Sequence, residues 1–215
     1  MIRAIVLAAG ESRRMGAQKM LLPFGSATVI AHVVDQLLNS AIDQVLVVVG
    51  HAGDSVAEAL SGRAVAIVHN PDYKSGMLSS VRCGLRALPE QCSAIMVALG
   101  DQPAITTGLI DELLQTFARN DKGIVTPLFQ GKRGHPLLFS ERYRAEILTH
   151  YDDVGLRGLL HAHPDDVFEW PAPTAAVLSD MDYPDDYRRA LAALESATAE
   201  RAGVRKRPGA AAQQN

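Results

Sequence analysis

The sequence predicts an α/β fold in which a doubly wound, mostly parallel sheet lies between two layers of helices, a three-layer α/β/α arrangement. Short apolar runs that end at glycine or polar residues alternate with segments whose apolar residues recur at helical spacing. These short runs are apolar almost throughout, which is typical of strands buried on both faces. Parallel strands need long crossover connections, and the intervening helices supply them.

The alternation of strand and helix is regular over residues 1–120. Each expected strand is a brief run rich in β-branched residues, and each expected helix has one apolar face. Ser26 and Asp54 stand where polar side chains cap helices, at the start of the first two. The strands are expected at residues 2–7, 45–49, 65–68 and 94–99, and the helices at residues 26–38, 54–60, 75–88 and 107–117.

The pattern is looser over residues 121–197. Short strands are expected at residues 124–129 and 136–139, and the Gln-Gly-Lys-Arg-Gly-His segment between them is expected to form a flexible hairpin. A last helix is expected at residues 182–197. Residues 198–215 are rich in alanine, glutamine, arginine and glycine without apolar periodicity, so we expect a disordered tail. Residues 1–197 are therefore expected to form a single domain.

Composition limits the classes of partner. The 21 basic and 24 acidic residues leave a formal charge of −3, so no basic field predicts binding to nucleic acid or to a membrane surface. No segment approaches the roughly 18 apolar residues that indicate a membrane-spanning helix. Cys83 and Cys92 are too few for a disulfide framework and are expected to be reduced core residues. We expect a cytoplasmic protein with small-molecule or protein partners.

The loop after the first expected strand has the composition of a phosphate-binding site. Residues 7–19 read Leu-Ala-Ala-Gly-Glu-Ser-Arg-Arg-Met-Gly-Ala-Gln-Lys. Small residues let a nucleotide approach the backbone of Ala8, Ala9 and Gly10, and Gly16 allows the chain to turn. Arg14 and Lys19 are the natural phosphate-binding cations.

An isolated glycine-rich stretch is more often a surface turn, but this one follows a strand at the carboxyl edge of the sheet, where open α/β sheets bind ligands. The spacing of Gly10 and Gly16 does not fit the dinucleotide fingerprint G-x-G-x-x-G, and the P-loop sequence Gly-Lys-Ser/Thr is missing. Hydride transfer and ordinary ATP hydrolysis are therefore disfavoured.

Two acidic segments could hold a divalent metal ion. Asp101 lies in a Gly-Asp-Gln-Pro sequence at the end of an expected strand, and such a carboxylate can bind Mg²⁺ against phosphate oxygens. The same tetrapeptide could equally be a turn or a helix cap. Asp182 is the expected partner of Asp101 in a metal site. Asp185 and Asp186 lie where the last helix is expected to begin. We expect them to interact with the positive end of the helix dipole and not to bind metal.

Together these segments resemble the nucleotidyltransferase superfamily typified by the molybdenum cofactor cytidylyl- and guanylyltransferases. The resemblance covers almost the whole chain up to the tail. The family loop, Leu-Ala-(Ala/Gly)-Gly-x-Ser-x-Arg-Met-Gly-x(2,3)-Lys, matches residues 7–19 and places Arg14 and Lys19 on its phosphate-binding cations. Ala9, the Gly-Asp-Gln-Pro sequence and the Arg-Gly-His-Pro sequence of residues 133–136 resemble the cytidylyl branch.

Two further segments carry the resemblance. Residues 76–81, Gly-Met-Leu-Ser-Ser-Val, resemble the family's nucleobase and ribose contact at a helix start. Residues 180–186, Asp-Met-Asp-Tyr-Pro-Asp-Asp, resemble its Asp-x-Asp-Thr-Pro-Glu-Asp metal motif, with Tyr183 in the usual threonine position. That replacement alters the local hydrogen bonding and keeps the carboxylate.

The resemblance implies transfer of CMP from CTP to molybdenum-bound molybdopterin, with release of pyrophosphate. Residues 1–120 would then bind the nucleotide and residues 121–197 the acceptor, with Mg²⁺, or Mn²⁺ in its place, as cofactor. The implied residues are Arg14, Lys19 and Asp101 for catalysis; Leu7, Ala8, Ala9, Gly10, Gly16, Gly76 and Ser80 for the nucleotide; Arg133, Gly134 and His135 for the acceptor; and Asp101 with Asp182 for the metal.

Three alternatives stay open. The chain could be a guanylyltransferase of the same superfamily, or a non-catalytic accessory protein that carries the cofactor to a molybdenum hydroxylase. The same fold also hosts other acceptors, such as sugar phosphates. Arg14, Lys19, Asp101 and Asp182 favour catalysis, because a carrier would not need both the carboxylates and the pyrophosphate-binding cations.

Overall fold

The computed structural model describes residues 1–204 and contains one main sheet of eight strands. The strand order is β10-β7-β9-β6-β1-β4-β5, and β8 pairs with β7. The strands of this sheet are β1 (Ile2–Ala8), β4 (Gln44–Val49), β5 (Val65–His69), β6 (Ala94–Leu99), β7 (Ile124–Phe129), β8 (Lys132–Arg133), β9 (Leu137–Ser140) and β10 (Val167–Pro171). Two further strands, β2 (Pro23–Phe24) and β3 (Ala27–Thr28), form a separate antiparallel pair.

The sheet is mostly parallel, as the sequence predicts. β1 runs parallel to both of its neighbours, β4 and β6, while β4 pairs in parallel with β5 and β7 with β10. β9 is antiparallel to both β6 and β7. The connection from β7 to β9 is a short hairpin around β8, which is too short for the crossover that a parallel strand needs.

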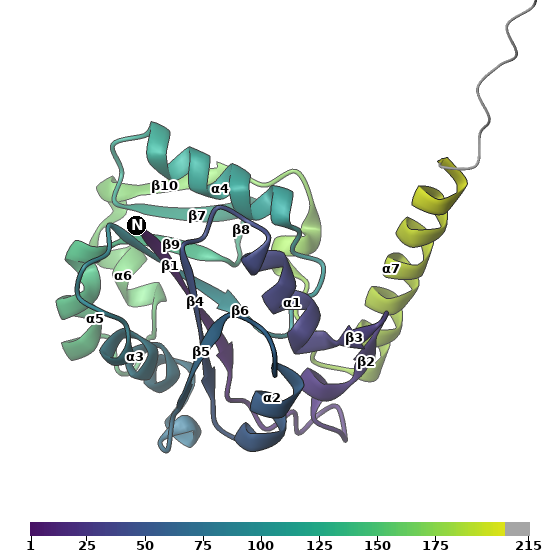
Figure 1. Ribbon diagram of the computed structural model, residues 1–215. Helices are drawn as coiled ribbons and strands as arrows, with labels where there is room; N and C mark the ends of the chain where they lie inside the picture. The colour runs from purple at the N-terminus through teal and green to yellow at the C-terminus, as the bar shows by residue number, and fades with distance from the viewer. Residues whose placement is uncertain (205–215) are drawn as a thin grey trace, which may run out of the picture.

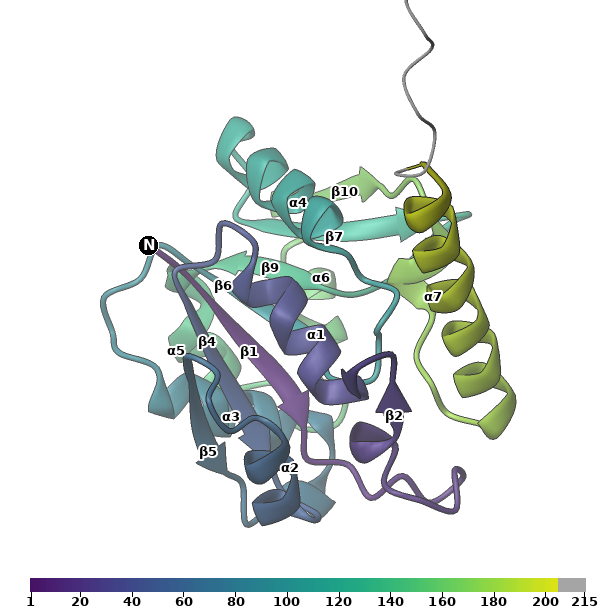
Figure 2. The ribbon, with the colours of Figure 1, turned by 45° about the vertical axis from the view of Figure 1, so that its right-hand side comes forward.

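Helices cover both faces of the sheet (Figures 1 and 2). Along β1, the side chains of Ala4 and Val6 join a core cluster with α1, α2 and α4, whereas Ile5 and Leu7 join a second cluster with α3, α5 and α6. This alternation follows from the period of two along a strand. The helices are α1 (Val29–Leu38), α2 (Gly53–Ala59), α3 (Met77–Ala87), α4 (Thr107–Arg119), α5 (Arg144–Thr149), α6 (Arg157–Ala162) and α7 (Pro184–Val204).

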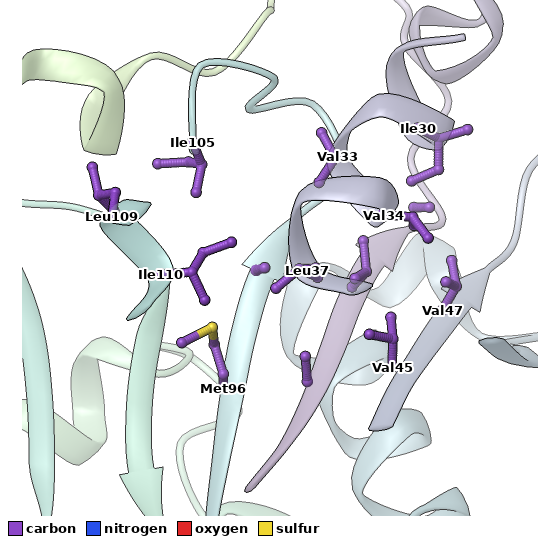
Figure 3. Close-up of a cluster of buried hydrophobic side chains, with 14 of the residues drawn as sticks. Ile30, Val33, Val34, Leu37, Val45, Val47, Met96, Ile105, Leu109 and Ile110 are labelled. Atoms are coloured by element: carbon purple, nitrogen blue, oxygen red, sulfur yellow. The ribbon is translucent and has the colours of Figure 1, made fainter. Parts of the chain in front are cut away.

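The core under α1 and α4 is shown in Figure 3. Ile30, Val34 and Leu37 of α1 pack toward the sheet, where Val47 of β4 and Met96 of β6 face them. Each of these side chains is almost fully buried. This apolar layer fixes the position of β1 and β6 and therefore of the loops that leave their carboxyl ends.

Some predicted boundaries need correction. Thr28, not Ser26, caps α1, because Ser26 lies in the turn between β2 and β3. α2 begins one residue earlier than expected, with Ala52 rather than Asp54 at the N-cap position. The last helix, α7, runs from Pro184 to Val204, so the expected disordered tail begins too early; its remaining part, residues 205–215, lies outside the described residues.

The sheet has a topological switch point at the carboxyl ends of β1 and β6. From β1 the chain adds β4 and β5 on one side and then crosses to β6 on the other side. The amide of Gly100 donates to the carbonyl of Leu7 at 3.0 Å, so the two strands stay paired to their ends. Loops that leave such a point diverge and open a crevice, which is where doubly wound sheets bind ligands. Within residues 1–204, no helix combines the length and apolarity needed to cross a membrane.

Candidate active site

The loop after β1 is held in shape by its own polar side chains. The Ser12 hydroxyl donates to Gln18 Oε1 at 2.6 Å and accepts from the Lys19 amide at 3.1 Å. The Gln18 amide nitrogen donates to the carbonyls of Gly10 and His51 at 3.2 and 3.3 Å. Gly16 has a φ of +70°, the left-handed conformation that glycine adopts without strain. The loop is therefore a fixed cradle rather than a solvated turn.

Lys19 lies at the centre of a charge cluster at the end of this loop. Its Nζ forms an ion pair with Asp101 Oδ2 and lies 3.2 Å from Asp182 Oδ1. Arg14 Nη1 lies 3.2 Å from the other oxygen of Asp182, and the Arg14 guanidinium stacks 5.7 Å from the centre of the Tyr183 ring. The structure therefore brings together Arg14, Lys19, Asp101 and Asp182, the four charged residues that the sequence singled out.

Burial and neighbouring charges shift the pKa values of Lys19 and Asp101. The side chains of Lys19 and Asp101 are only 11% and 12% exposed. Burial alone would lower the pKa of Lys19, but the carboxylates of Asp101 and Asp182 outweigh it and raise that pKa, so Lys19 stays protonated. Burial raises the pKa of Asp101, and the ammonium of Lys19 offsets part of that rise. The Asp101 carboxylate thus needs a cation beside it.

The segment before α7 fixes Asp182. Asp186 Oδ2 accepts from the backbone amides of Asp182 and Tyr183 at 3.0 and 2.8 Å, which confirms the prediction that Asp186 serves the start of a helix. The Met181 amide donates to the Asp101 carbonyl at 3.1 Å, and its side chain is buried. Two segments far apart in sequence are therefore joined at the cluster. Figure 2 shows the loop after β1 running toward this end of α7.

The donor set suits a divalent cation that arrives with a phosphate ligand. Among residues 1–204, no group of three or more histidine, cysteine, aspartate or glutamate side chains could hold a metal ion. Asp101 and Asp182 supply two carboxylates that already share one cation, Lys19. Mg²⁺ is commonly held by one or two carboxylates together with substrate phosphate oxygens and water. The two carboxylates fit that kind of site.

Two hollows adjoin the charge cluster. A small pocket of about 170 Å³ lies against the loop and is lined by Arg13, Arg14, Lys19 and Asp182 among others. A larger cleft of about 990 Å³ is lined by Gln102 and Asp180, which are the sequence neighbours of the clustered segments. Residues from α3, β7, α6 and the β8 hairpin complete it, among them Met77, Thr126, Lys132, Arg133, His135, Arg157 and His161. Asp182 and Lys19 therefore line the small pocket, and the residues next to the two carboxylates in sequence, Gln102 and Asp180, line the large cleft.

The predicted acceptor residues line the large cleft, but their backbone amides are already used. The Gly134 amide donates to the Pro127 carbonyl at 2.8 Å and the His135 amide to the Val177 carbonyl at 2.9 Å. Of the residues implied for the acceptor, Gly134 and His135 therefore have no backbone N–H free to bind an anion, because both amides pair within the chain. Arg133 lies in the cleft wall and is 2.7 Å from Glu169, which neutralises part of its charge.

The cleft also holds polar groups that have no partner among the described side chains. Arg157, at the start of α6, lines the cleft and forms no ion pair within the described residues. Burial lowers the pKa of His135, so its ring is neutral near pH 7, and its Nδ1 is buried without a hydrogen-bond partner among residues 1–204. Gln102 Oε1 is also buried and unpaired there. No motif points to Arg157, whereas Gln102 belongs to the Gly-Asp-Gln-Pro sequence but was given no role of its own.

The predicted nucleotide-binding residues divide into two groups. Leu7 and Ala8 belong to β1 with buried side chains, and Ala9 is buried too, so these three hold the loop, whereas Gly10 and Gly16 are exposed on it.

The second nucleotide-binding segment lies at the start of α3. Gly76 precedes α3 with a φ of +101°. Ser80 is buried and its hydroxyl accepts from the buried amide of Asn70 at 3.0 Å, which gives Ser80 a positioning role. Asn70 also donates to Ser79 at 2.9 Å and was not predicted.

Comparison with known proteins decides the family. Residues 4–167 match the family model described as the MobA-like NTP transferase domain. The chain belongs to this family. The molybdenum cofactor cytidylyltransferase of Escherichia coli (strain K12) is 29% identical over 187 residues, which cover 86% of this chain and 93% of that protein.

Solved structures of similar proteins share the whole MobA-like domain. A nucleotidyl transferase from Methanothermobacter superposes with a TM-score of 0.80 at 27% identity and covers 92% of this chain and 99% of its own. The protein Rv0371c of Mycobacterium tuberculosis H37Rv, solved in complex with manganese, has a TM-score of 0.73 at 27% identity, covering 89% and 97%. The MobA-like domain described here is thus a nucleotidyltransferase, and proteins of this family typically use divalent metals.

Proposed function

We propose that this MobA-like nucleotidyltransferase transfers CMP from CTP to the terminal phosphate of molybdenum-bound molybdopterin and releases pyrophosphate. The choice of CTP is supported by Ala9, by the Gly-Asp-Gln-Pro sequence at Asp101 and by the Arg-Gly-His-Pro sequence at His135, which the cytidylyl branch shares. The choice of acceptor is supported by the name of the Escherichia coli relative, which is similar over most of both chains.

One observation carries the proposal. Lys19 and Asp182 line the small pocket of the β1 loop, Lys19 pairs with Asp101, and the next residue after Asp101, Gln102, lines the large cleft. A triphosphate in the small pocket would present its α-phosphorus toward the cleft, where an acceptor phosphate could approach in line. The cleft, at about 990 Å³, is in the upper range of small-molecule sites and has room for a tricyclic pterin.

The chain's residues then act by position and charge. Arg14 and Lys19 would hold the leaving pyrophosphate, since both are cations beside the loop pocket. A divalent ion bound by Asp101 and Asp182 would stabilise the charge that develops on the transferred phosphate. The attacking phosphate is already largely ionised near neutral pH, so no general base is needed. His135 accordingly serves the cleft wall and not proton transfer.

The cleft supplies the charge that an anionic acceptor needs. Lys132 and Arg157 line it, and Arg157 has no carboxylate partner among the described side chains. We assign Arg157 to the acceptor phosphate in place of the Gly134 and His135 amides. Arginine suits this role because its planar guanidinium matches two phosphate oxygens.

The test is turnover with defined substrates. The purified protein is incubated with Mg²⁺, molybdenum-loaded molybdopterin and each nucleoside triphosphate in turn, and pyrophosphate release is followed. We expect release with CTP that depends on the acceptor. Release with GTP alone would move the protein to the guanylyl branch, and no release with any triphosphate would favour the cofactor-carrying accessory role.

A further inference from the structure

The ammonium of Lys19 occupies the space between the two carboxylates that are proposed to bind metal. Asp101 and Asp182 come from segments 81 residues apart in sequence, and Lys19 Nζ contacts an oxygen of each. Lys19 and Asp101 are both buried, so their attraction is weakly screened by water. A cation entering between these carboxylates must therefore compete with Lys19.

The local charge balance favours Lys19 over a bare divalent ion. Arg14 and Lys19 face Asp101 and Asp182, so two cations neutralise two carboxylates. A bare divalent ion would add two positive charges to these balanced pairs and would leave the buried ammonium of Lys19 without an anionic partner, which is costly. A triphosphate that arrives with the ion brings more negative than positive charge and gives Lys19 new oxygens to contact.

We propose that Lys19 acts as an internal counter-ion that makes metal binding depend on the nucleotide. In this account Lys19 holds Asp101 and Asp182 together and keeps bare divalent ions out. With a metal–nucleotide complex bound, Lys19 would turn from the carboxylates to the phosphates, and Asp101 and Asp182 would be free to hold the ion. The inference deepens the proposed function, because it concerns the same site, but it does not depend on which base or acceptor is used.

The geometry allows this movement. Lys19 has a flexible four-carbon side chain, and its backbone is fixed at the start of the 3₁₀ helix Lys19–Leu21 by the hydrogen bond from its amide to Ser12. Lys19 and Asp182 both line the small pocket where the phosphates are proposed to lie. The ammonium can therefore reach carboxylates or phosphates while the loop stays in place.

The first test measures Mn²⁺ binding without any nucleotide, by the electron paramagnetic resonance signal of the free ion. We expect Lys19→Met to bind Mn²⁺ about tenfold or more tightly than the wild type, a coupling of ordinary size between two ligands of one site. Adding Asp101→Asn to this variant should abolish the gain. Lys122→Met is the matched control, because it removes the same charge from a lysine that lines neither hollow and whose Nζ donates to the Asp165 carbonyl. Mn²⁺ binding to Lys19→Met that is no tighter than to the wild type overturns the proposal.

A second test uses the wild-type protein and so does not depend on the folding of a variant. The Nζ resonance of Lys19, assigned by its loss in Lys19→Arg, is followed by nitrogen NMR during additions of Mg²⁺ and CTP. We expect it to stay in place with Mg²⁺ alone and to move with Mg²⁺ and CTP together. An equal shift with Mg²⁺ alone contradicts the proposal. A shift produced only by GTP with Mg²⁺ would leave this inference standing and would count against CTP as the substrate.

Discussion

Asp101 is the residue on which the proposed chemistry depends most. It stands at the carboxyl end of β6, beside Lys19, with its backbone carbonyl joined to the Met181 amide. A carboxylate in this position can hold a divalent ion only while it is charged. The proposed role of Asp101 therefore depends on the negative charge of its carboxylate.

Replacement of Asp101 by asparagine keeps the shape of the side chain and removes its charge. We expect the rate of pyrophosphate release to fall on the order of 100-fold or more, the loss typical of one preorganised charge-stabilising group. Asp54→Asn is the control, since Asp54 is an exposed carboxylate in the first turn of α2. Activity of the Asp101 variant within a fewfold of wild type would refute the assigned role.

Arg157 is predicted to act on the acceptor alone. Arg157→Ala should raise the KM for the acceptor by about 10-fold or more, because a charge-assisted hydrogen bond to phosphate contributes roughly 1.5–3 kcal/mol. The KM for CTP should not change, since Arg157 lines the large cleft and not the loop pocket. Arg119→Ala, on the last turn of α4, tests the loss of a positive charge elsewhere. Equal effects on both substrates would contradict the separation of the two hollows.

At the scale of single residues, the sequence predicts the charged residues of the site better than the polar residues that hydrogen-bond to the site segments. The sequence predicts Lys19 as a phosphate-binding cation and Asp101 with Asp182 as a pair of carboxylates, and the structure brings the three side chains together. Ser12 and Asn70 were not found, because a single polar residue in a loop has no spacing pattern. Their roles appear only when the fold places their partners beside them.

The β8 hairpin contributes several residues to the wall of the cleft. Gly134 lies so close to the segment before α7 that an added Cβ would be 2.1 Å from the Val177 carbonyl oxygen. Real Cβ atoms do not approach backbone this closely, so either the hairpin or the Val177 segment must move. The hairpin therefore sets one wall of the cleft by direct contact.

Gly134→Ala should displace the hairpin and weaken acceptor binding. We expect the KM for the acceptor to rise, CTP binding to be unaffected, and the free energy of unfolding to drop by about 1–3 kcal/mol, as for other overpacked sites. Gly108→Ala in α4 is the matched control, because a Cβ there meets nothing within 4 Å. An acceptor KM unchanged in Gly134→Ala would show that the hairpin does not position the acceptor.

Elements with strong periodicity were predicted well, and short ones were missed. The strand expected at residues 94–99 is β6 (Ala94–Leu99), whose short, continuous apolar run is typical of a strand buried on both faces. The helices α5 and α6 have six residues each, too few for a helical pattern to appear. β10 contains Glu169 and Pro171, which obscure its strand character, and it forms an edge strand where proline is tolerated.

For the whole molecule, two partly buried histidines predict how stability depends on pH. Burial lowers the pKa values of His32, which packs on Phe24, and of His135. Below about pH 6.5 these two histidines are protonated in the unfolded chain but stay neutral in the folded protein until the pH is lower. Proton binding therefore favours the unfolded state in this range. Their contribution is therefore present above that pH and is lost as the pH falls through the depressed folded-state values.

Urea unfolding at pH 7.5 and pH 5.5 tests this dependence. We expect the free energy of unfolding to be smaller at pH 5.5, and the decrease to be shallower in His32→Gln than in the wild type. His161→Gln serves as the control, because His161 is exposed. A decrease of the same size in His32→Gln and in the wild type would show that His32 does not contribute.

The whole architecture was predictable because strand and helix alternate over the first half of the chain. The strands expected at residues 124–129 and 136–139 with a hairpin between them are β7 and β9. The insertion of β9 between β7 and β6 and the position of the cleft were not predicted, because both depend on contacts between segments far apart in sequence. The same distinction applies to function. The loop motif and the carboxylates indicate nucleotidyl transfer, whereas the acceptor is selected by cleft residues such as Arg157 that no motif marks.

The most direct measurement uses CTP with radioactive phosphorus at the α position and follows where the label goes. With Mg²⁺ and molybdenum-loaded molybdopterin, the account predicts that the wild type moves the label to the acceptor, one equivalent for each pyrophosphate released, and that Asp101→Asn does so on the order of 100-fold more slowly. Label that stays in CTP or appears as free CMP, with the acceptor unmodified, would contradict the account.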